Sequence, residues 1–261
     1  MIYVTGDCHQ DFEKFSTRNF PEQKQLTKED YVIVCGDFGG VWSIIKESAE
    51  EACLLDWLNE KPFTTLFVDG NHENFDRLYS YPEEEWHGGK IHKIRPSIFH
   101  LMRGQVYEID GKKIFAFGGA RSHDIDGGIL EITDPYFKLK QRRLEQDWIP
   151  YRVNHISWWK EELASKKEME EGRKSLAVHH NTVDYIVTHC CASSILHAMS
   201  RGRYQADVET DYLEEIRQNT KYTKWYFGHY HGDQEVTEKE TLLYKKIIKC
   251  VVKPLASAMG I

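Results

Sequence analysis

Short apolar runs alternate along the chain with polar loops that contain glycine. The runs are three to five residues long and rich in β-branched and aromatic residues, which is typical of buried strands. They cover Ile2–Thr5, Tyr31–Cys35, Thr64–Val68, Asp184–Thr188 and Trp225–Phe227. Two further runs, 105–109 and 112–117, flank Asp110-Gly111 and predict a hairpin. One or two final strands are expected within Leu242–Val252.

Segments between these runs show the apolar spacing of helices. Strands that alternate with helices predict an α/β fold. We expect helices over about Asp11–Phe20, ended by Pro21; over about Ile44–Asn59, capped by Ser43; over about Ile156–Ala177; and over about Asp207–Gln218.

The region of about 124–180 interrupts this pattern. Its first part, Asp124–Val153, is polar, charged and aromatic with few regular periods. We expect an insertion or lid there. The chain shows no repeat, low-complexity stretch or linker, so residues 1–261 are expected to form one domain.

Composition and charge narrow the function classes. With 41% hydrophobic and 13% aromatic residues, the chain can bury a large core. The net charge of -7 does not favour a nucleic-acid footprint or a polybasic membrane surface. Met1 leads directly into apolar residues without a leader pattern, and no apolar run approaches the roughly 18 residues of a membrane span. We therefore expect a cytoplasmic protein that does not contact membranes, with its six cysteines as thiols.

The strand-like runs end in residues that can bind metal ions. Carboxylate, imidazole and amide groups together suit divalent ions such as Mn²⁺, Fe²⁺ or Zn²⁺, and no Cys₄ or Cys₂His₂ set indicates a structural zinc. Two such ions about 3.5–4 Å apart can hold a phosphoryl group and generate a hydroxide. The residues are Asp7 and His9, Asp37, Asn71 and His72, His189, and His229 and His231.

Five short motifs at these strand ends resemble, in order, those of the calcineurin-like metallophosphoesterases. They span residues 7–231, and each follows a strand-like run. The resemblance implies a four-layer α/β sandwich of two mixed β-sheets flanked by helices, with two metals in loops at one edge. The motifs are Asp7-Cys8-His9, Gly36-Asp37, Gly70-Asn71-His72-Glu73, Thr188-His189 and Gly228-His229-Tyr230-His231.

The resemblance also implies a role for each residue. Asp7, His9 and His231 would hold the first metal. Asn71, His189 and His229 would hold the second, and Asn71 would also contact substrate. Asp37 would bridge the two ions, and a metal-bridging hydroxide would attack phosphorus while His72 acts as general acid. Mn²⁺ is the expected ion, with Fe, Zn, Ni or Mg as alternatives.

The chain departs from the family pattern after the bridging acid. Many members carry a second acid three residues later, followed by Arg-Gly, where this chain has Gly40, Val41 and Trp42. His72 must then be oriented by Asp69, Asp7 or a main-chain carbonyl. The missing arginine counts against a phosphoprotein substrate, and Arg121 or Arg77 could replace it as a phosphate contact.

Several functions remain open from the sequence. A phosphodiesterase or phosphomonoesterase acting on a small phosphoester or a nucleotide needs only a pocket, and the insertion aromatics Tyr136, Phe137, Trp148 and Tyr151 could stack a base. A nuclease needs a basic groove, for which the compact cluster is Lys138, Lys140, Arg142 and Arg143, diluted by Glu145 and Asp147. A protein phosphatase and a catalytically silent, metal-stabilised binding module are the remaining alternatives.

Overall fold

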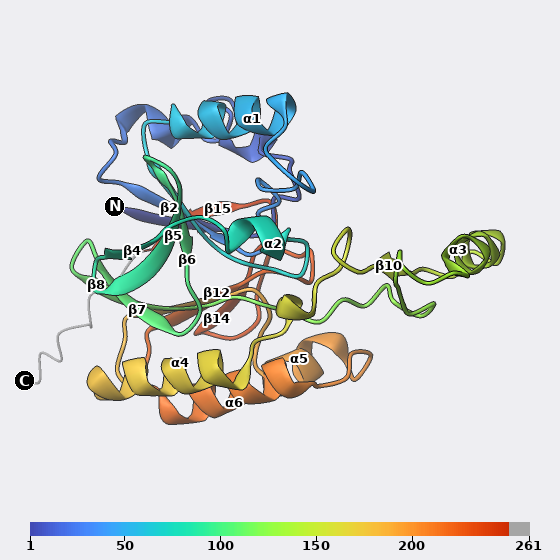
Figure 1. Cartoon of the computed structure of the whole chain (residues 1–261). Coiled ribbons are helices and arrows are strands. Elements are labelled where there is room, and N and C mark those ends of the chain that lie inside the picture. Colours follow the sequence, from blue (N-terminus) through green and yellow to red (C-terminus); the bar gives the residue numbers. More distant parts are fainter. Residues whose placement is uncertain (251–261) are drawn as a thin grey trace, which may run out of the picture.

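Two β-sheets lie face to face between two layers of helices (Figure 1). The structure is a computed structural model that describes residues 1–250. This arrangement confirms the expected α/β sandwich of two mixed sheets flanked by helices.

The first sheet has the strand order β15-β1-β2-β3-β6-β5-β4. Strands β1, β2, β3 and β6 run parallel, and the flanking strands are antiparallel. Their bounds are β1 Ile2–Thr5, β2 Tyr31–Cys35, β3 Thr64–Val68, β4 Glu83–Trp86, β5 Gly89–Arg95, β6 Ile98–Leu101 and β15 Ile247–Lys249.

The second sheet has the order β13-β14-β12-β11-β8-β7. Its four central strands β14, β12, β11 and β8 are parallel. Strands β7 and β8 form the predicted hairpin. The bounds are β7 Gln105–Ile109, β8 Lys112–Phe117, β11 Tyr185–Thr188, β12 Lys224–Phe227, β13 Gln234–Glu235 and β14 Glu240–Leu242.

Alternation of side chains along the strands builds the layers. In β2, Ile33 points into the core between the sheets, whereas Val32 and Val34 point outward into the core beneath α1 (Ala49–Asn59). Both faces of each sheet are therefore buried, which explains the nearly continuous apolar runs in the sequence.

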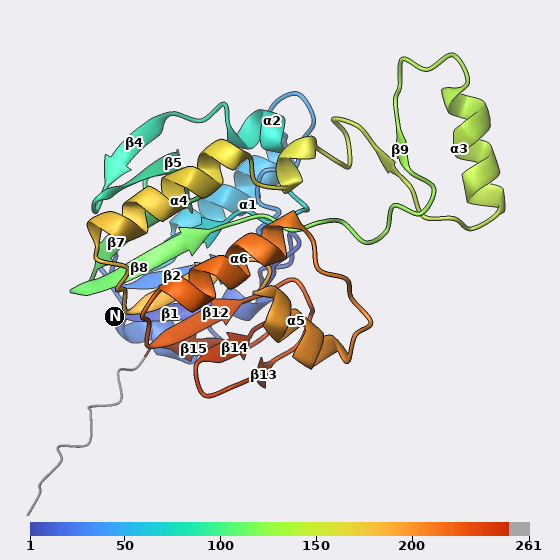
Figure 2. The ribbon, with the colours of Figure 1, turned by 90° about the horizontal axis from the view of Figure 1, so that it is seen from below.

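The helices divide between the two outer faces. α1 and α2 (Phe75–Leu78) contribute to the core over the first sheet. The second sheet is covered by α4 (Lys166–Val178), α5 (Ser193–Ser200) and α6 (Val208–Asn219), as Figures 1 and 2 show. Helix α6 begins after Asp207, as predicted.

Three expected helices have different bounds. Asp11–Phe20 contains a short 3-10 turn, Glu13–Phe15, and a second turn follows at Pro21–Gln25. The phenylalanines of residues 11–20 are buried without a regular helix. Phe12 packs on Phe38, and Phe20 packs on Phe63.

Helix α1 starts five residues later than expected. Ser48 is its cap, accepting a hydrogen bond from the Glu51 amide at 3.2 Å, while the amide of Ser43 donates to the Glu51 carboxylate at 2.8 Å. Likewise, α4 starts at Lys166 rather than Ile156, because Ser165 and Glu168 form a capping box there.

Residues 124–153 form an arm that stands away from the sandwich (Figures 1 and 2). The arm carries α3 (Phe137–Gln146), so this part is more regular than the sequence suggested. The short strands β9 (Ile129–Leu130) and β10 (Arg152–Val153) pair in parallel in its neck. Residues 251–252, the end of the last predicted strand segment, lie outside the described residues.

Candidate metal centre

The predicted metal ligands meet at one edge of the sandwich. Strands β1, β2 and β3 run parallel in one sheet, and β11 and β12 run parallel in the other, so each sheet delivers its polar loops at the carboxyl ends of its strands. The two sets are joined by the amide of His229, which donates to Asp7 Oδ1 at 2.9 Å.

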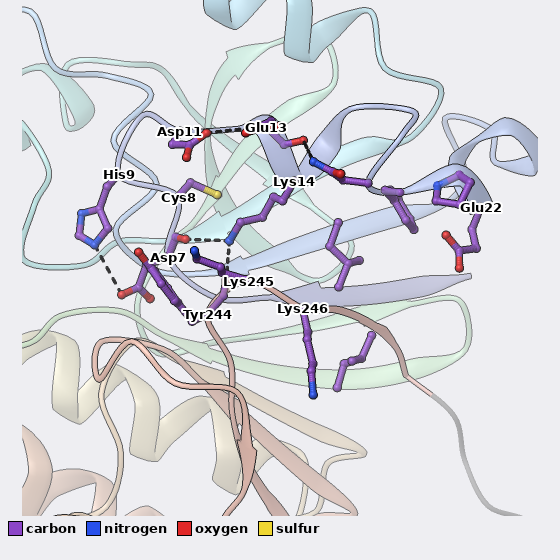
Figure 3. Close-up of a pocket in the computed structure, with 15 residues that line it drawn as sticks. Asp7, Cys8, His9, Asp11, Glu13, Lys14, Glu22, Tyr244, Lys245 and Lys246 are labelled. Carbon is purple, nitrogen blue, oxygen red and sulfur yellow. Dashed lines mark hydrogen bonds and ion pairs between the residues drawn. The ribbon is translucent and has the colours of Figure 1, made fainter.

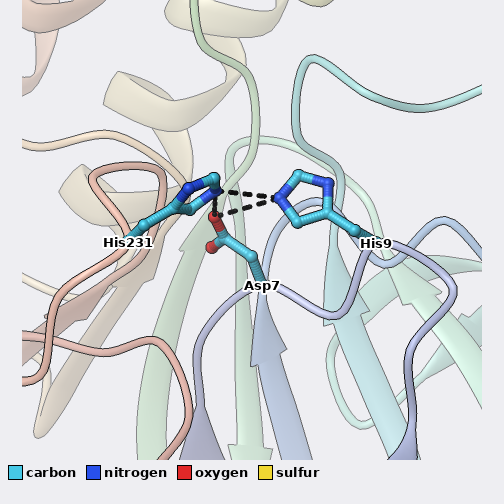
Figure 4. Close-up of side chains that lie close together, drawn as sticks. All are labelled: Asp7, His9 and His231. Carbon is cyan, nitrogen blue, oxygen red and sulfur yellow. Dashed lines mark hydrogen bonds and ion pairs between the residues drawn. The ribbon is translucent and has the colours of Figure 1, made fainter.

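Asp7, His9 and His231 form the first group of converging side chains (Figure 4). The Nε2 atoms of the two histidines lie 2.9 Å apart. Asp7 Oδ2 lies 3.2 Å from Nε2 of His231 and 3.7 Å from Nε2 of His9. Two imidazole nitrogens and a carboxylate oxygen at these separations fit a single shared cation.

A second group forms around His189. Its Nε2 atom lies 3.4 Å from Asp37 Oδ2 and 3.3 Å from Asn71 Oδ1. Ligand atoms of Asp37, His189 and His229 all lie within 4.8 Å of one another. This donor set is also suited to a divalent cation.

Asp37 stands between the two groups. The Oδ2 atom that faces His189 is also 3.6 Å from His9 Nε2, and Oδ1 accepts a hydrogen bond from the His72 amide at 2.9 Å. Asp37 thus groups with His9 and His72 on one side and with His189 and His229 on the other, which places its carboxylate between the two ligand groups.

The facing charges set the ionisation states of the ligands. Burial alone would lower the pKa of His189, but Asp37 and then Asp7 raise it to about 10, so a bound ion would have to displace a proton from this imidazole. Burial alone would raise the pKa of Asp7, but hydrogen bonds with His231 and His9 lower it to about 2. Burial would likewise raise the pKa of Asp37, and His189 outweighs it, so that this pKa falls well below its usual value. Burial lowers the pKa of His229 to about 3, which keeps this imidazole neutral and able to bind a metal.

Three motif glycines lie in close contact with these ligands. A Cβ atom on Gly36 would lie 2.1 Å from His189 Nδ1, one on Gly70 would lie 2.1 Å from Asp37 Oδ1, and one on Gly228 would lie 2.1 Å from Asp7 Oδ1. A side chain at any of these positions would therefore displace a ligand.

The ligand loops are also strained. His9, Asp37, His229 and His231 all have positive φ, between 43° and 67°. This left-handed conformation is uncommon outside glycine and gathers at functional sites.

Buried polar residues that the sequence analysis did not single out hold the loops in place. The Glu73 carboxylate accepts hydrogen bonds from the amides of Phe38 at 2.7 Å and Gly39 at 3.2 Å. Asn71 Nδ2 donates to Ser122 Oγ at 3.3 Å, which leaves the amide oxygen of Asn71 facing His189. Glu73 is the last residue of the motif Gly70-Asn71-His72-Glu73, so the sequence named it without assigning it this role.

His123 was also missed by the sequence analysis. Its Nε2 atom lies 3.0 Å from Nε2 of His229, and its ring stacks on Tyr204 with centroids 5.2 Å apart. His123 thus contacts the predicted metal ligand His229 although it belongs to none of the five motifs.

His72 lies beside the first group, with its ring edge-on to His9 at a centroid distance of 5.2 Å. Neither carboxylate considered for orienting it does so. Asp69 is taken up by His100 at 3.0 Å and by Arg103 Nε at 2.9 Å. Gly40 lacks a side chain because a Cβ atom there would lie 2.2 Å from the Phe38 ring.

Three arginines differ in what they contact. Arg77 is turned to Glu51, with Nη1 2.5 and 2.7 Å from the two carboxylate oxygens, so we do not retain it as a substrate contact. Arg121 is exposed and has no carboxylate within 4.0 Å in residues 1–250. Arg152, from the arm, lines a cavity with His9 and His72 and pairs with Asp124 through Nε at 3.0 Å.

The cysteines beside the motifs are buried. Burial raises the pKa of Cys8 and of Cys191 to about 12, and raises that of Cys190 well above its usual value. These groups are therefore protonated thiols, of low reactivity toward oxidants and metals.

This combination of sandwich, strand-end loops and clustered carboxylate, imidazole and amide ligands defines a metal-dependent phosphoester hydrolase. The chain belongs to the calcineurin-like phosphoesterase family, whose sequence profile matches residues 1–233.

Several known proteins share sequence similarity with the chain. Lariat debranching enzyme A of Xenopus laevis is 28% identical over 206 residues, which cover 64% of this chain and 36% of the relative. The lariat debranching enzymes of Homo sapiens and Drosophila melanogaster are each 24% identical, with 88% of this chain and 42% of the relative covered. The chain thus spans less than half the length of these relatives.

Among residues 1–250, no helix combines the length and the apolar character that a membrane span requires.

Proposed function

We propose that this chain is a dinuclear-metal phosphodiesterase. The observation that carries the proposal is the position of Asp37 between the two ligand groups, 3.6 Å from His9 Nε2 and 3.4 Å from His189 Nε2, with His72 beside it. When bound, two divalent ions would activate a water as the nucleophile and would neutralise charge on the phosphoryl oxygens.

The protein's own residues then have distinct roles. Asp7, His9 and His231 hold one ion; Asn71, His189 and His229 hold the other; Asp37 contacts both. His72 binds no metal in this proposal and donates a proton to the leaving oxygen. Mn²⁺ is the first ion to test, and a cytoplasmic location, where the cysteines stay reduced, belongs to the same proposal.

A diester is favoured over a monoester because two cavities flank the metal centre. His9 lines both of them. One, of about 620 Å³, extends past Asp7 and Tyr244. The other, of about 280 Å³, extends past His72 and Arg152. A phosphodiester has two limbs to accommodate, whereas a monoester has one.

The relatives support the same choice. Their name, lariat debranching enzyme, describes the opening of a branch, which is an action on a diester link rather than the removal of a terminal phosphate. A nucleic acid or a nucleotide is therefore a substrate class to test alongside small aryl diesters.

Arg152 is the arginine best placed to contact the substrate phosphate. It enters the smaller cavity from the neck of the arm, where Asp124 holds it in a two-point ion pair. The following segment is fastened to the sandwich, since Trp159 Nε1 and His155 Nδ1 lie 2.7 and 2.8 Å from Asp76. Arg121 remains the second choice.

Only the neck of the arm, with Arg152, lies close enough to the metal centre to act as a lid. Tyr136 and Trp148 are 65% and 92% exposed, and α3 stands apart from the sandwich in Figure 2. For these aromatics to stack on a substrate base, the arm would have to bend or the substrate would have to extend along it.

The deciding experiment uses metal-stripped protein reloaded with Mn²⁺. Hydrolysis of an aryl phosphodiester is compared with that of the matching monoester, in wild type, His72→Ala and Asp37→Ala. We expect metal-dependent turnover that favours the diester and is lost in Asp37→Ala. His72→Ala should keep its metal and lose about 10²–10⁴-fold in rate. Bound metal without turnover of either ester would indicate a silent, metal-stabilised binding module instead.

A further inference from the structure

The larger cavity beside the metal centre has a cationic side. It runs from Asp7 and His9 along the turn that precedes β15, and it has a volume of about 620 Å³ (Figure 3). Lys14, Lys245 and Lys246 all line it. We call this cavity, as lined by these three lysines, the lysine cleft.

None of the three lysines is neutralised by a partner. In residues 1–250, none has a carboxylate oxygen within 4.0 Å, although the protein as a whole is acidic. The hydrogen atoms of Lys14 are used by main-chain oxygens, with Nζ 2.7 Å from Asp7 O and 2.5 Å from Tyr244 O. Lys14 therefore contributes charge from a fixed position, while the side chains of Lys245 and Lys246 are free to bind.

The turn that carries the two free lysines is held rigidly. The Asp233 carboxylate accepts hydrogen bonds from three successive amides, those of Tyr244 at 2.9 Å, Lys245 at 3.2 Å and Lys246 at 3.1 Å. The Tyr244 ring stacks on His231, with centroids 4.7 Å apart. The main chain that carries Lys245 and Lys246 is thus fixed beside the first metal group, and their exposed side chains extend from it.

Acidic residues also line the cavity, among them Asp7 of the metal centre. Asp11 and Glu13 lie along the upper wall in Figure 3, and Glu22 lies at the far end, whereas Lys245 lies next to Asp7 and Tyr244. One oxygen of Asp11 accepts a hydrogen bond from the Glu13 amide at 3.0 Å. Of the two lysines without a carboxylate partner, Lys245 is the one nearer to Asp7, and Lys246 lies farther along the cleft (Figure 3).

We propose that the lysine cleft binds a second phosphate group, carried by one limb of the phosphodiester substrate. This inference rests on the proposed function and narrows its substrate class to diesters that carry a further phosphate, such as nucleotides. Lys245 and Lys246 contact that phosphate, and Lys14 adds to the field.

The position of His72 indicates which substituent of the phosphodiester lies in which cavity. His72 lines the smaller cavity, so the limb that departs after protonation lies there. The limb in the lysine cleft is then the one that keeps the scissile phosphate.

The test compares two nucleotide esters with the same leaving group. One is the p-nitrophenyl ester of thymidine 5′-phosphate, and the other is the same ester with an added 3′-phosphate. With wild type and Mn²⁺, we expect the added phosphate to lower KM by roughly 10-fold, since two lysine contacts to a phosphate are gained. The difference should vanish in K245Q/K246Q and persist in the matched control K166Q/K167Q, an exposed pair on α4.

A binding measurement keeps the inference separate from turnover. Calorimetry on Mn²⁺-loaded protein should show thymidine 3′,5′-bisphosphate binding roughly 10-fold more tightly than thymidine 5′-phosphate in wild type, and equally in K245Q/K246Q. Equal affinity of wild type for the two nucleotides, or a preference for the bisphosphate that survives in K245Q/K246Q, would overturn the proposal that the lysine cleft binds a second phosphate. Preferential binding without hydrolysis of either ester would overturn the proposed function alone.

Discussion

The Nδ1 atom of His189 lies 2.9 Å from the main-chain carbonyl oxygen of Cys35. Because a carbonyl oxygen can only accept, Nδ1 carries a proton in either charge state of the ring, and Nε2, which faces Asp37, is the atom at which a metal would bind. This contact joins β11 of one sheet to β2 of the other and sets the tautomer that a metal needs.

Replacing His189 should remove one of two metals. In His189→Ala, we expect bound Mn²⁺ to fall from about two to about one per chain and diester turnover to fall at least ~10²-fold, because the bridging arrangement is lost. Elemental analysis of dialysed protein and an aryl diester assay check both. The exposed His197→Ala on α5 is the control, and full metal content in His189→Ala would contradict the assignment.

The two remaining arginines can be ranked by substitution. Arg152→Gln should lower kcat/KM for an aryl phosphodiester by roughly 10²-fold, because a charged hydrogen bond to the phosphate is lost from the cavity of His72. Arg121→Gln should change it less than about threefold. Steady-state kinetics on both variants decides, and the reverse order would assign the phosphate contact to Arg121.

Asp69 is predicted to be important for folding. It is fully buried between Arg103 and His100, so Asp69→Asn leaves the arginine charge uncompensated and should cost about 3–5 kcal/mol at pH 7. Urea unfolding measures this. Glu84→Gln, which breaks an exposed pair with Lys93, should cost about 1 kcal/mol or less.

The same residue predicts a pH dependence. Burial alone would raise the pKa of Asp69, but Arg103 and then His100 hold it well below the usual value near 3.8. Its contribution to stability is therefore full above that value and is lost as pH falls toward the folded-state pKa. Between pH 5 and pH 2, the free energy of unfolding should fall more steeply in wild type than in Asp69→Asn; parallel curves would contradict this.

Glu209 should have the opposite effect. Burial raises its pKa to about 8, and its Oε1 atom has no hydrogen-bond partner among residues 1–250. The folded state holds the proton more tightly than the unfolded state, so stability falls as pH rises from about 4.5 through about 8.

Glu209→Gln tests this effect directly. The amide keeps an oxygen for the Ala164 amide, now 2.7 Å from Glu209 Oε2, and removes the titration. We expect the variant to gain stability over wild type as pH rises from 6 to 9 in thermal unfolding. The exposed Glu235→Gln should follow wild type, and a constant difference between Glu209→Gln and wild type across this range would refute the assignment.

The parallel strands β1, β2, β3, β11 and β12 were predictable because buried parallel strands leave continuous apolar runs, whereas β4, β5 and β6 were not predicted individually. Ile2–Thr5, Tyr31–Cys35 and Thr64–Val68 were placed with their observed bounds. The side chains at their ends were predictable as a group because parallel strands deliver their loops to one edge of the sheet.

Features set by tertiary contacts were not predictable. The segment Asp11–Phe20, expected as a helix, is shaped by aromatic packing instead. No local sequence pattern distinguishes Arg77 from Arg152. Arg77 pairs with Glu51, whereas Arg152 lines the site and pairs with Asp124, 28 residues earlier in the chain. The lysine cleft joins Lys14 to Lys245, which no local pattern relates.

The close approach of Gly36, Gly70 and Gly228 to three different ligands has a consequence for mutational tolerance. Each glycine is covalently next to one motif residue but sterically tied to a ligand from another strand, as Gly36 is to His189. In a library of random single variants, these glycines should be as intolerant as the ligands themselves. No second change at the adjoining residue should rescue them, because the clash lies across the interface between separate loops.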